Sequence, residues 1–340
     1  MPAKNWDFKA RTKMKIFPIF IPHLGCPFNC VYCDQVAITK SKQPEINSIS
    51  DSIKAFCEYN KNDEKEIAFF GGTFTKLKKE LQQAYFDAVN VHKNEFDGIR
   101  ISTRPDSIDQ NIIDFCKDNN VRTIELGIQS FDTSVLNATK RGYTSQTAKD
   151  SCNLIKENKI RLGIQLMPGL PGFNTSSLKT TIETTIALEP EFVRIYPTIV
   201  LKNTKLEEWY QAGDYSPLSL IESIKISAEM IMKFKEKNII IIKVGLHSDI
   251  DKENIIAGPY HQSFGELVRA EMLRNKILNS YEDKTLEISK YDISLFKGFN
   301  SKMLKEIKLD NKIDSLPVKI NNKLLKDQFK FSKAKPDGYW

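Results

Sequence analysis

The stretch KIFPIFIPHLGCPFNCVYC, residues 15–33, joins a short apolar run to a cluster of three cysteines. The apolar part is short and broken by proline, which is typical of a β-strand and not of a membrane helix or a signal peptide. The loop behind it carries Cys26, Cys30 and Cys33, which are half of the six cysteines of the chain. Thiolates from one tight loop can converge on a metal, so the sequence predicts a metal or cluster site after the first strand.

Composition excludes several classes of protein. Among the 340 residues, 41% are hydrophobic and 27% are charged, which is enough to bury a core and to keep a polar surface. No apolar run approaches the roughly 18 residues of a membrane helix, and we expect a cytoplasmic protein with no membrane partner. In such a compartment the cysteines stay reduced, and Cys57, Cys116 and Cys152 are expected to be buried in the core.

The net charge of +7 is concentrated at the two ends of the chain. Residues 1–15 carry five Lys and Arg against one Asp, and residues 301–340 carry ten Lys against five acidic residues. Basic ends are compatible with a phosphate-bearing partner such as tRNA. Lysines that are merely solvated at the termini are the alternative.

Strand-like and helix-like segments alternate along the first two thirds of the chain. After the first strand at 15–25, the strand-like runs span residues 66–72, 98–105, 122–130, 160–169 and 191–200. Helical periodicity lies between them, at residues 77–93, 108–119 and 145–158. This order predicts an α/β fold, a partial (β/α)6 TIM-type barrel with its chemistry at the carboxyl ends of the strands.

Beyond the barrel, which we assign to residues 13–200, the pattern changes. Residues 219–238 have helical periodicity, and residues 238–246 form a β-branched run that predicts a strand. We therefore expect a C-terminal extension of α+β type over residues 201–340, ending in a basic tail.

Two kinds of metal site fit the cysteine spacing. A tetrahedral zinc site would need a fourth ligand, for which His23 is the one nearby histidine. An iron–sulfur cube held by three thiolates would instead leave one iron open toward the barrel mouth. Tyr32, directly before the third cysteine, could then shield the cluster from solvent.

The cysteine loop resembles that of the radical S-adenosylmethionine (SAM) superfamily, and further phrases match in order along the chain. These phrases are GGT at 71–73, STRPD at 102–106, ELGIQS at 125–130, MPGLPG at 167–172 and RIYP at 194–197. The same phrases are also similar to the radical domain of the Elongator catalytic subunit, which modifies the wobble uridine of tRNA. This resemblance covers about residues 13–265.

The resemblance implies a [4Fe–4S] cluster on Cys26, Cys30 and Cys33, with SAM chelated to its open iron. Oxygen-independent coproporphyrinogen oxidases show a similar frame of polar residues around the cofactor. The residues implied to bind SAM are Gly71, Gly72, Thr73, Ser102, Gln129, Arg141 and Gln165, with Phe20 as a weaker candidate for the wall of the site. Thr73 stands where the superfamily has Glu, Ser102 replaces an acidic residue and Gln165 replaces Asp.

The resemblance implies an enzyme that cleaves SAM reductively to a 5′-deoxyadenosyl radical, with flavodoxin or ferredoxin as a reductant, on an unknown substrate. One alternative is an enzyme that modifies tRNA, and another is a non-catalytic module that binds cluster and SAM. No Gly-rich acetyl-CoA loop is found after Gly265, so the acetyl transfer of Elongator is not expected from this sequence. His247, His261, Asp249 and Tyr260 are further candidates without an assigned role.

Overall fold

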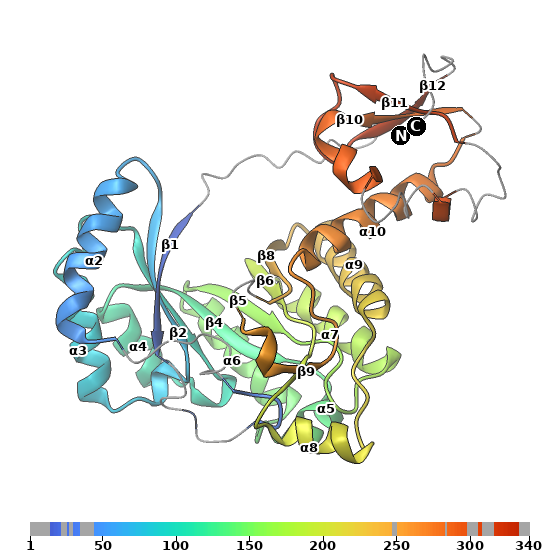
Figure 1. Ribbon diagram of the computed structural model, residues 1–340. Helices are drawn as coiled ribbons and strands as arrows, with labels where there is room; N and C mark the ends of the chain where they lie inside the picture. The colour runs from blue at the N-terminus through green and yellow to red at the C-terminus, as the bar shows by residue number, and fades with distance from the viewer. Residues whose placement is uncertain are drawn as a thin grey trace.

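Alternating strands and helices build the larger part of the molecule (Figure 1). The computed structural model describes residues 14–21, 26, 30–34, 44–246, 250–282, 284–297, 305–307 and 316–332. Within them, the main sheet has seven strands in the order β1-β2-β3-β4-β5-β6-β8, and every neighbouring pair is parallel. The strands are β1 (Lys15–Ile21), β2 (Lys65–Gly71), β3 (Gly98–Thr103), β4 (Val121–Gln129), β5 (Arg161–Leu166), β6 (Phe192–Ile195) and β8 (Ile240–Val244).

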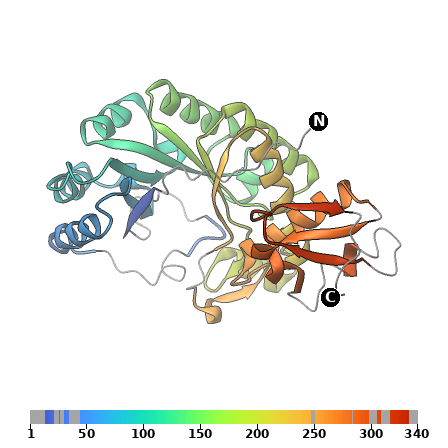
Figure 2. The same ribbon diagram turned by 90° about the horizontal axis from the view of Figure 1, so that it is seen from above.

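Helices cover the outer face of the curled sheet, as the view from above shows (Figure 2). They are α2 (Ile46–Tyr59), α3 (Lys79–Asn90), α4 (Gln110–Asp118), α6 (Ser145–Glu157), α7 (Thr175–Leu188) and α9 (Leu220–Glu236). The start of α9 is fixed by a capping box between Ser219 and Glu222, and Asn174 and Ser177 cap α7 in the same way. The predicted partial TIM-type barrel is therefore confirmed, and β8 adds a seventh strand from beyond residue 200. The domain boundary at that residue stays a prediction.

The core lies between the sheet and these helices. Alternate residues of the strands, such as Phe69 and Ile101, point outward into it and are almost fully buried. Cys57, Cys116 and Cys152 are free thiols in the same core, as their positions in amphipathic segments predict. Burial raises the pKa of the Cys116 thiol to about 12, which keeps it protonated and unreactive at neutral pH.

Charged side chains fill the inner, concave side of the sheet. The buried Glu125 carboxylate accepts hydrogen bonds from Arg100 Nη1 at 2.7 Å and from Arg194 Nε at 2.8 Å. Glu66, which is fully buried, accepts from Arg100 Nε at 2.7 Å and also pairs with Arg161. Buried charges are tolerated only when they are paired in this way, so the network joins strands β2 to β6.

Two aromatic rings complete the inner layer. The Arg194 guanidinium carbon lies 5.1 Å from the centroid of the Phe70 ring, and that of Arg100 lies 4.6 Å from the Phe192 ring. These contacts join β6 to β2 and β3 to β6, which are not neighbours in the sheet. The interior of the half-barrel is therefore packed with side chains beneath its mouth.

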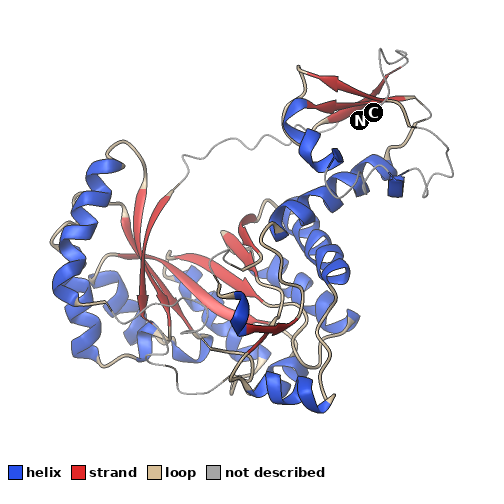
Figure 3. Cartoon of the chain, viewed as in Figure 1, coloured by secondary structure: helices blue, strands red, loops and turns tan. Residues whose placement is uncertain are grey.

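The C-terminal part forms a smaller α+β unit, as predicted (Figure 3). Helix α10 (Phe264–Asn279) packs against α9 and leads into a three-stranded sheet of order β11-β10-β12. Its strands are β10 (Thr285–Ser289), β11 (Val318–Asn321) and β12 (Phe329–Ser332). Leu286 and Ile288 of the central strand lie in a separate hydrophobic core with Ile277 of α10. In the described parts of the chain, no helix combines the length and the apolar character that crossing a membrane requires.

The inner charge network should contribute measurably to the free energy of unfolding. Glu125→Gln leaves Arg100 and Arg194 without their shared carboxylate, and we expect the free energy of unfolding to fall by about 3–5 kcal/mol. Chemical denaturation followed by circular dichroism measures the change. The matched control is Glu183→Gln, which removes a surface pair with Lys179 on α7 and should cost less than about 1 kcal/mol. Equal losses for both variants would contradict a structural role for the network.

Candidate functional site

The cysteine loop lies at the mouth of the half-barrel, directly after β1. Cys26, Cys30 and Cys33 are free and half-buried, in contrast to the three buried cysteines of the core. Within the described residues, no three His, Cys, Asp or Glu side chains converge closely enough to hold a metal ion. Residues 22–25 and 27–29 lie outside the described residues, so the zinc alternative through His23 is not tested.

Each cysteine nevertheless has a distinct polar environment. Cys30 Sγ accepts from Arg141 Nη1 at 3.1 Å and from Arg104 Nη1 at 3.7 Å. Cys26 Sγ lies 3.3 Å from Thr73 Oγ1. Burial, together with the neighbouring Cys30, raises the pKa of Cys33 to about 12, and a bound metal would have to displace that proton.

Neighbouring elements hold the backbone of the loop on both sides. The Val31 carbonyl accepts from the Leu206 backbone N–H at 2.7 Å, in helix α8 (Lys205–Ala212). The Val31 N–H donates to the Thr139 carbonyl at 3.5 Å, at the end of helix α5 (Thr133–Ala138). Val31 and Tyr32 are buried in a small apolar cluster with Leu206. This packing fixes the part of the loop that carries the last two cysteines.

The Gly71-Gly72-Thr73 turn follows β2 and touches the end of β1. Gly71 has φ +113°, and a Cβ there would lie 2.6 Å from the Ile21 carbonyl oxygen. The Gly72 N–H donates to the same oxygen at 2.8 Å. Only glycine fits this close approach, so the turn is held tightly against the strand that leads into the cysteine loop.

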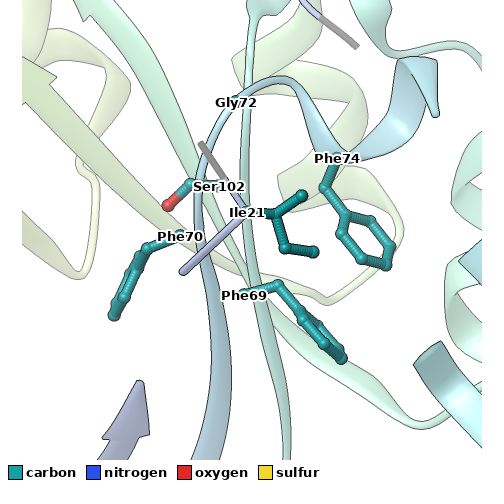
Figure 4. A pocket seen from close by; sticks show the side chains of 6 residues that line it. All are labelled: Ile21, Phe69, Phe70, Gly72, Phe74 and Ser102. Atoms are coloured by element: carbon teal, nitrogen blue, oxygen red, sulfur yellow. The ribbon is translucent and has the colours of Figure 1, made fainter. Parts of the chain in front are cut away.

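A small pocket opens beside this turn. It is a shallow hollow lined by Ile21, Phe69, Phe70, Gly72, Phe74 and Ser102 (Figure 4). Its wall is apolar apart from the Ser102 hydroxyl and the backbone of the glycine turn. The ring of Phe20 lies 6.0 Å from that of Phe70, which places the weaker predicted candidate next to the pocket.

Gln129 ends β4 in a strained and unsatisfied state. Its φ is +69°, and the β4–β5 register shifts between Gly127 and Gln129. The side chain is buried, and its Oε1 atom has no hydrogen-bond partner among the described residues. An orphaned buried acceptor at a barrel mouth is where a ligand with a donor group would fit.

Gln165 and Arg141 also lie at the mouth of the barrel, but their side chains differ in hydrogen bonding. Gln165 of β5 is half-buried, pairs in register with Gly127 and Arg194, and makes no side-chain hydrogen bond within the described residues. Arg141 is buried, and its guanidinium is bonded to Cys30, to the Tyr32 hydroxyl at 3.1 Å and to other protein groups. All seven residues implied to bind SAM therefore lie at the mouth, and their contact with the cofactor stays a prediction.

The structure also shows a residue that the sequence analysis missed. Arg104 of the STRPD phrase is buried, pairs with Asp106 at 2.9 Å and points to Cys30. Its place directly after the third strand was a usable signal. His247 and Asp249 lie outside the described residues. His261 Nδ1 accepts from the Ser263 N–H at the start of α10, a helix-end contact.

The residue types at the mouth are those that an iron–sulfur cluster with SAM would need, although the three thiols do not converge on one point in this arrangement. Three half-buried thiols stand on one loop, two guanidinium groups face one of them, and an unpartnered acceptor and an apolar pocket lie close by. Zinc would need a fourth protein ligand, and the nearby His23 lies outside the described residues.

Sequence comparison agrees with this geometry. The model of the Radical SAM superfamily matches residues 20–185, and that of the Radical_SAM C-terminal domain matches residues 190–274. The tRNA uridine(34) acetyltransferase of Dehalococcoides mccartyi is 25% identical over 251 residues, which are 61% of this chain and 54% of that protein. Elongator complex protein 3 of Mus musculus is 27% identical over 238 residues, covering 62% of this chain and 42% of that protein.

Two further comparisons extend the picture. An uncharacterized protein of Methanocaldococcus jannaschii is 28% identical over 241 residues, 66% of this chain and 73% of that protein. The archaeal Elp3 of Methanocaldococcus infernus, solved without residues 1–46, has a TM-score of 0.61 at 20% identity and covers 77% of this chain and 63% of that one, which shows the same fold.

The chain thus spans only about half the length of these two curated relatives, the acetyltransferase and Elongator complex protein 3. These relatives confirm the predicted resemblance to the Elongator catalytic subunit. Since the two matching models account for nearly all of residues 20–274, the chain belongs to the radical SAM superfamily, and the prediction of a radical SAM enzyme is confirmed.

Proposed function

We propose that this chain binds a [4Fe–4S] cluster through Cys26, Cys30 and Cys33 and uses it to cleave SAM reductively. The observation that carries the proposal is the set of three free, half-buried thiols at the barrel mouth, two of them in polar contact with residues that follow strands β2 and β3, Thr73 and Arg104. When bound, the cluster supplies the electron that converts SAM to methionine and a 5′-deoxyadenosyl radical, which takes hydrogen from the substrate.

Different residues of the chain would bind different parts of SAM. The backbone of Gly71 and Gly72, with the Thr73 side chain, would line the methionine end of SAM. Gln129 Oε1, which has no protein donor among the described residues, would accept from the cofactor. Ser102 and Gln165 offer polar ends on β3 and β5, for which no hydrogen bond is formed within the described residues. Arg141 is implied by the resemblance to bind SAM, whereas its contacts support a role at Cys30.

The surroundings of the site suit radical chemistry, because a radical must be kept away from water and loose side chains. The layer of Arg194 and Phe70 closes the barrel beneath the mouth. The buried ring of Tyr32 closes it beside the cysteine loop. An exogenous reductant such as flavodoxin or ferredoxin would then deliver electrons through the cysteine loop.

A second, finer candidate is a tRNA substrate. It is supported by the relatives that are tRNA uridine(34) acetyltransferases and by the lysine-rich C-terminal residues. Lys323 and Lys326 are exposed in the turn between β11 and β12. The alternative to an enzyme is a non-catalytic module that only binds the cluster and SAM.

The cluster assignment predicts a clear separation among the cysteines. After anaerobic reconstitution, the chain should hold about four irons with acid-labile sulfide, and Cys26→Ala, Cys30→Ala or Cys33→Ala should each abolish the brown absorbance. Cys57→Ala, a change in the core, is the matched control and should keep it. Bound zinc with no sulfide would contradict the assignment.

SAM binding should depend on Gln129. We expect Gln129→Ala to weaken SAM binding to the reconstituted protein about tenfold, the effect of one lost buried hydrogen bond, with iron content unchanged. Isothermal titration calorimetry measures the affinity. Gln146→Ala, on the exposed face of α6, is the control and should bind as the wild type does.

Release of 5′-deoxyadenosine separates the enzyme from the non-catalytic module. The wild-type protein, reduced with dithionite or flavodoxin, should release it with methionine, and Gln129→Ala should release less at subsaturating SAM. Intact SAM after reduction in the presence of cell extract would favour the module.

The tRNA candidate predicts salt-dependent and selective binding. At physiological salt, bulk tRNA should bind at least about tenfold more tightly than heparin of equal charge, because specific contacts add to the electrostatic term. If Lys323 and Lys326 touch phosphates of single-stranded regions, changing both to Gln should reduce the log–log salt slope by about 1.4. Lys179→Gln on α7 is the control with an exposed lysine. Equal affinity for tRNA and heparin would exclude specific tRNA binding.

A further inference from the structure

We propose that Arg104 and Arg141 form a guanidinium pair that stabilises the reduced state of the cluster through Cys30. The inference rests on the proposed cluster site, and it concerns two residues that would act through a ligand of the cluster and not on the substrate. They are therefore positioning residues whose effect is on the reduction potential.

Both guanidinium groups are buried and point to the same sulfur. Cys30 Sγ lies 3.1 Å from Arg141 Nη1 and 3.7 Å from Arg104 Nη1, although the two arginines are 111 and 74 residues away in sequence. Arg104 also donates to the main-chain carbonyl oxygen of Arg141, which ties the two residues together. The arrangement is thus one unit built on two loops of the barrel mouth.

The orientation of each arginine is fixed by further contacts. Asp106 holds Arg104 through two hydrogen bonds of 2.9 Å. The Tyr143 hydroxyl accepts from Arg141 Nε at 3.0 Å and from Nη2 at 2.9 Å. The guanidinium carbons of Arg104 and Arg141 lie 5.3 and 5.1 Å from the centroid of the Tyr143 ring. Neither group can turn away from Cys30 without breaking several buried contacts.

The hydrogen-bond inventory of Arg141 argues against the role implied by the resemblance. A guanidinium has five N–H donors. Those of Arg141 are used by Tyr143 at Nε, by Cys30 and Tyr32 at Nη1, and by Tyr143 and the Gly127 carbonyl at Nη2. No donor is left for a SAM carboxylate in this arrangement.

The charge balance points to a negatively charged partner. Arg104 and Arg141 each direct a buried positive charge at Cys30, and the Asp106 carboxylate pairs with Arg104 on the side away from the sulfur contact. Buried positive charge is costly unless a negative partner, such as a thiolate or a reduced cluster, lies against it. Hydrogen bonds to the sulfurs and nearby charge are among the factors that set cluster potentials. One-electron reduction adds a negative charge, so the pair favours the reduced form and raises the potential.

The test is a redox titration of the full-length reconstituted protein, followed by electron paramagnetic resonance. At the potential where the wild-type cluster is half reduced, Arg141→Met should lower the ratio of reduced to oxidised cluster at least tenfold, a shift of about 59 mV for one electron. Arg104→Met should give a smaller shift in the same direction, because its contact is longer. Arg141→Lys, which keeps the charge, should recover part of the shift.

Arg122→Gln is the matched control, since Arg122 is exposed at the start of β4 and bonds to Asn120. Its midpoint should equal that of the wild type. Variants that load about four irons and keep the wild-type midpoint would overturn the inference and leave the cluster assignment intact. Loss of iron in the Met and Lys variants, with Arg122→Gln loaded, would assign the pair to cluster assembly and would also overturn it. Wild-type protein that takes up no iron and sulfide would refute the proposed function itself.

Discussion

The pairing of buried charges inside the half-barrel is the constraint on which the rest of the structure depends. Glu66 and Glu125 each accept from two arginines that come from different strands. A shift of any strand by one residue would turn its inner residues outward and leave charges without partners, at several kcal/mol each. The network therefore fixes the register of β2 to β6, and with it the height at which each strand ends.

The site follows from that register. Because the strands end at fixed heights, the Gly71-Gly72 turn, Ser102 and Gln129 come to one mouth, and the cysteine loop is set against them by the Ile21 carbonyl. Arg194 contributes both to the inner charge network and to the site, since it pairs with Glu125 and also lies over the ring of Phe70, which lines the pocket. Stability and site geometry thus share the same side chains.

Much of this could be predicted from the sequence. The six barrel strands and helices such as α3, α4, α6 and α9 follow from local periodicity and from turn residues, which are short-range signals. The cysteine loop and the glycine turn are contiguous motifs and were found for the same reason. The pairing of β8 with β6 was not, because two helices, α8 and α9, separate these strands in the chain and no local pattern reports which strand edge is free.

The buried charges of the barrel interior and the pair Arg104 and Arg141 also could not be predicted from local sequence patterns. Glu125, Arg100 and Arg194 look like ordinary surface charges in sequence, and only the curled sheet shows that they are buried. The resemblance implies that Arg141 contacts SAM, but a sequence match fixes the position of a residue in the chain and not the direction of its side chain. The direction of its side chain depends on Tyr143, two residues further along the chain, and on Cys30, which the fold brings to it from a distant segment.

Gln129 carries two energetic costs at the mouth of the barrel. A left-handed backbone at a residue other than glycine costs on the order of 1 kcal/mol or more, and a buried acceptor without a donor costs about 1–3 kcal/mol. Both costs fall on one residue, although a glycine at that position would remove the strain and an apolar side chain would remove the orphaned oxygen. Neighbouring parts of the barrel satisfy even their buried charges, so the same fold is able to avoid such costs. A ligand that donates a hydrogen bond to Gln129 Oε1 would offset the cost of the orphaned oxygen.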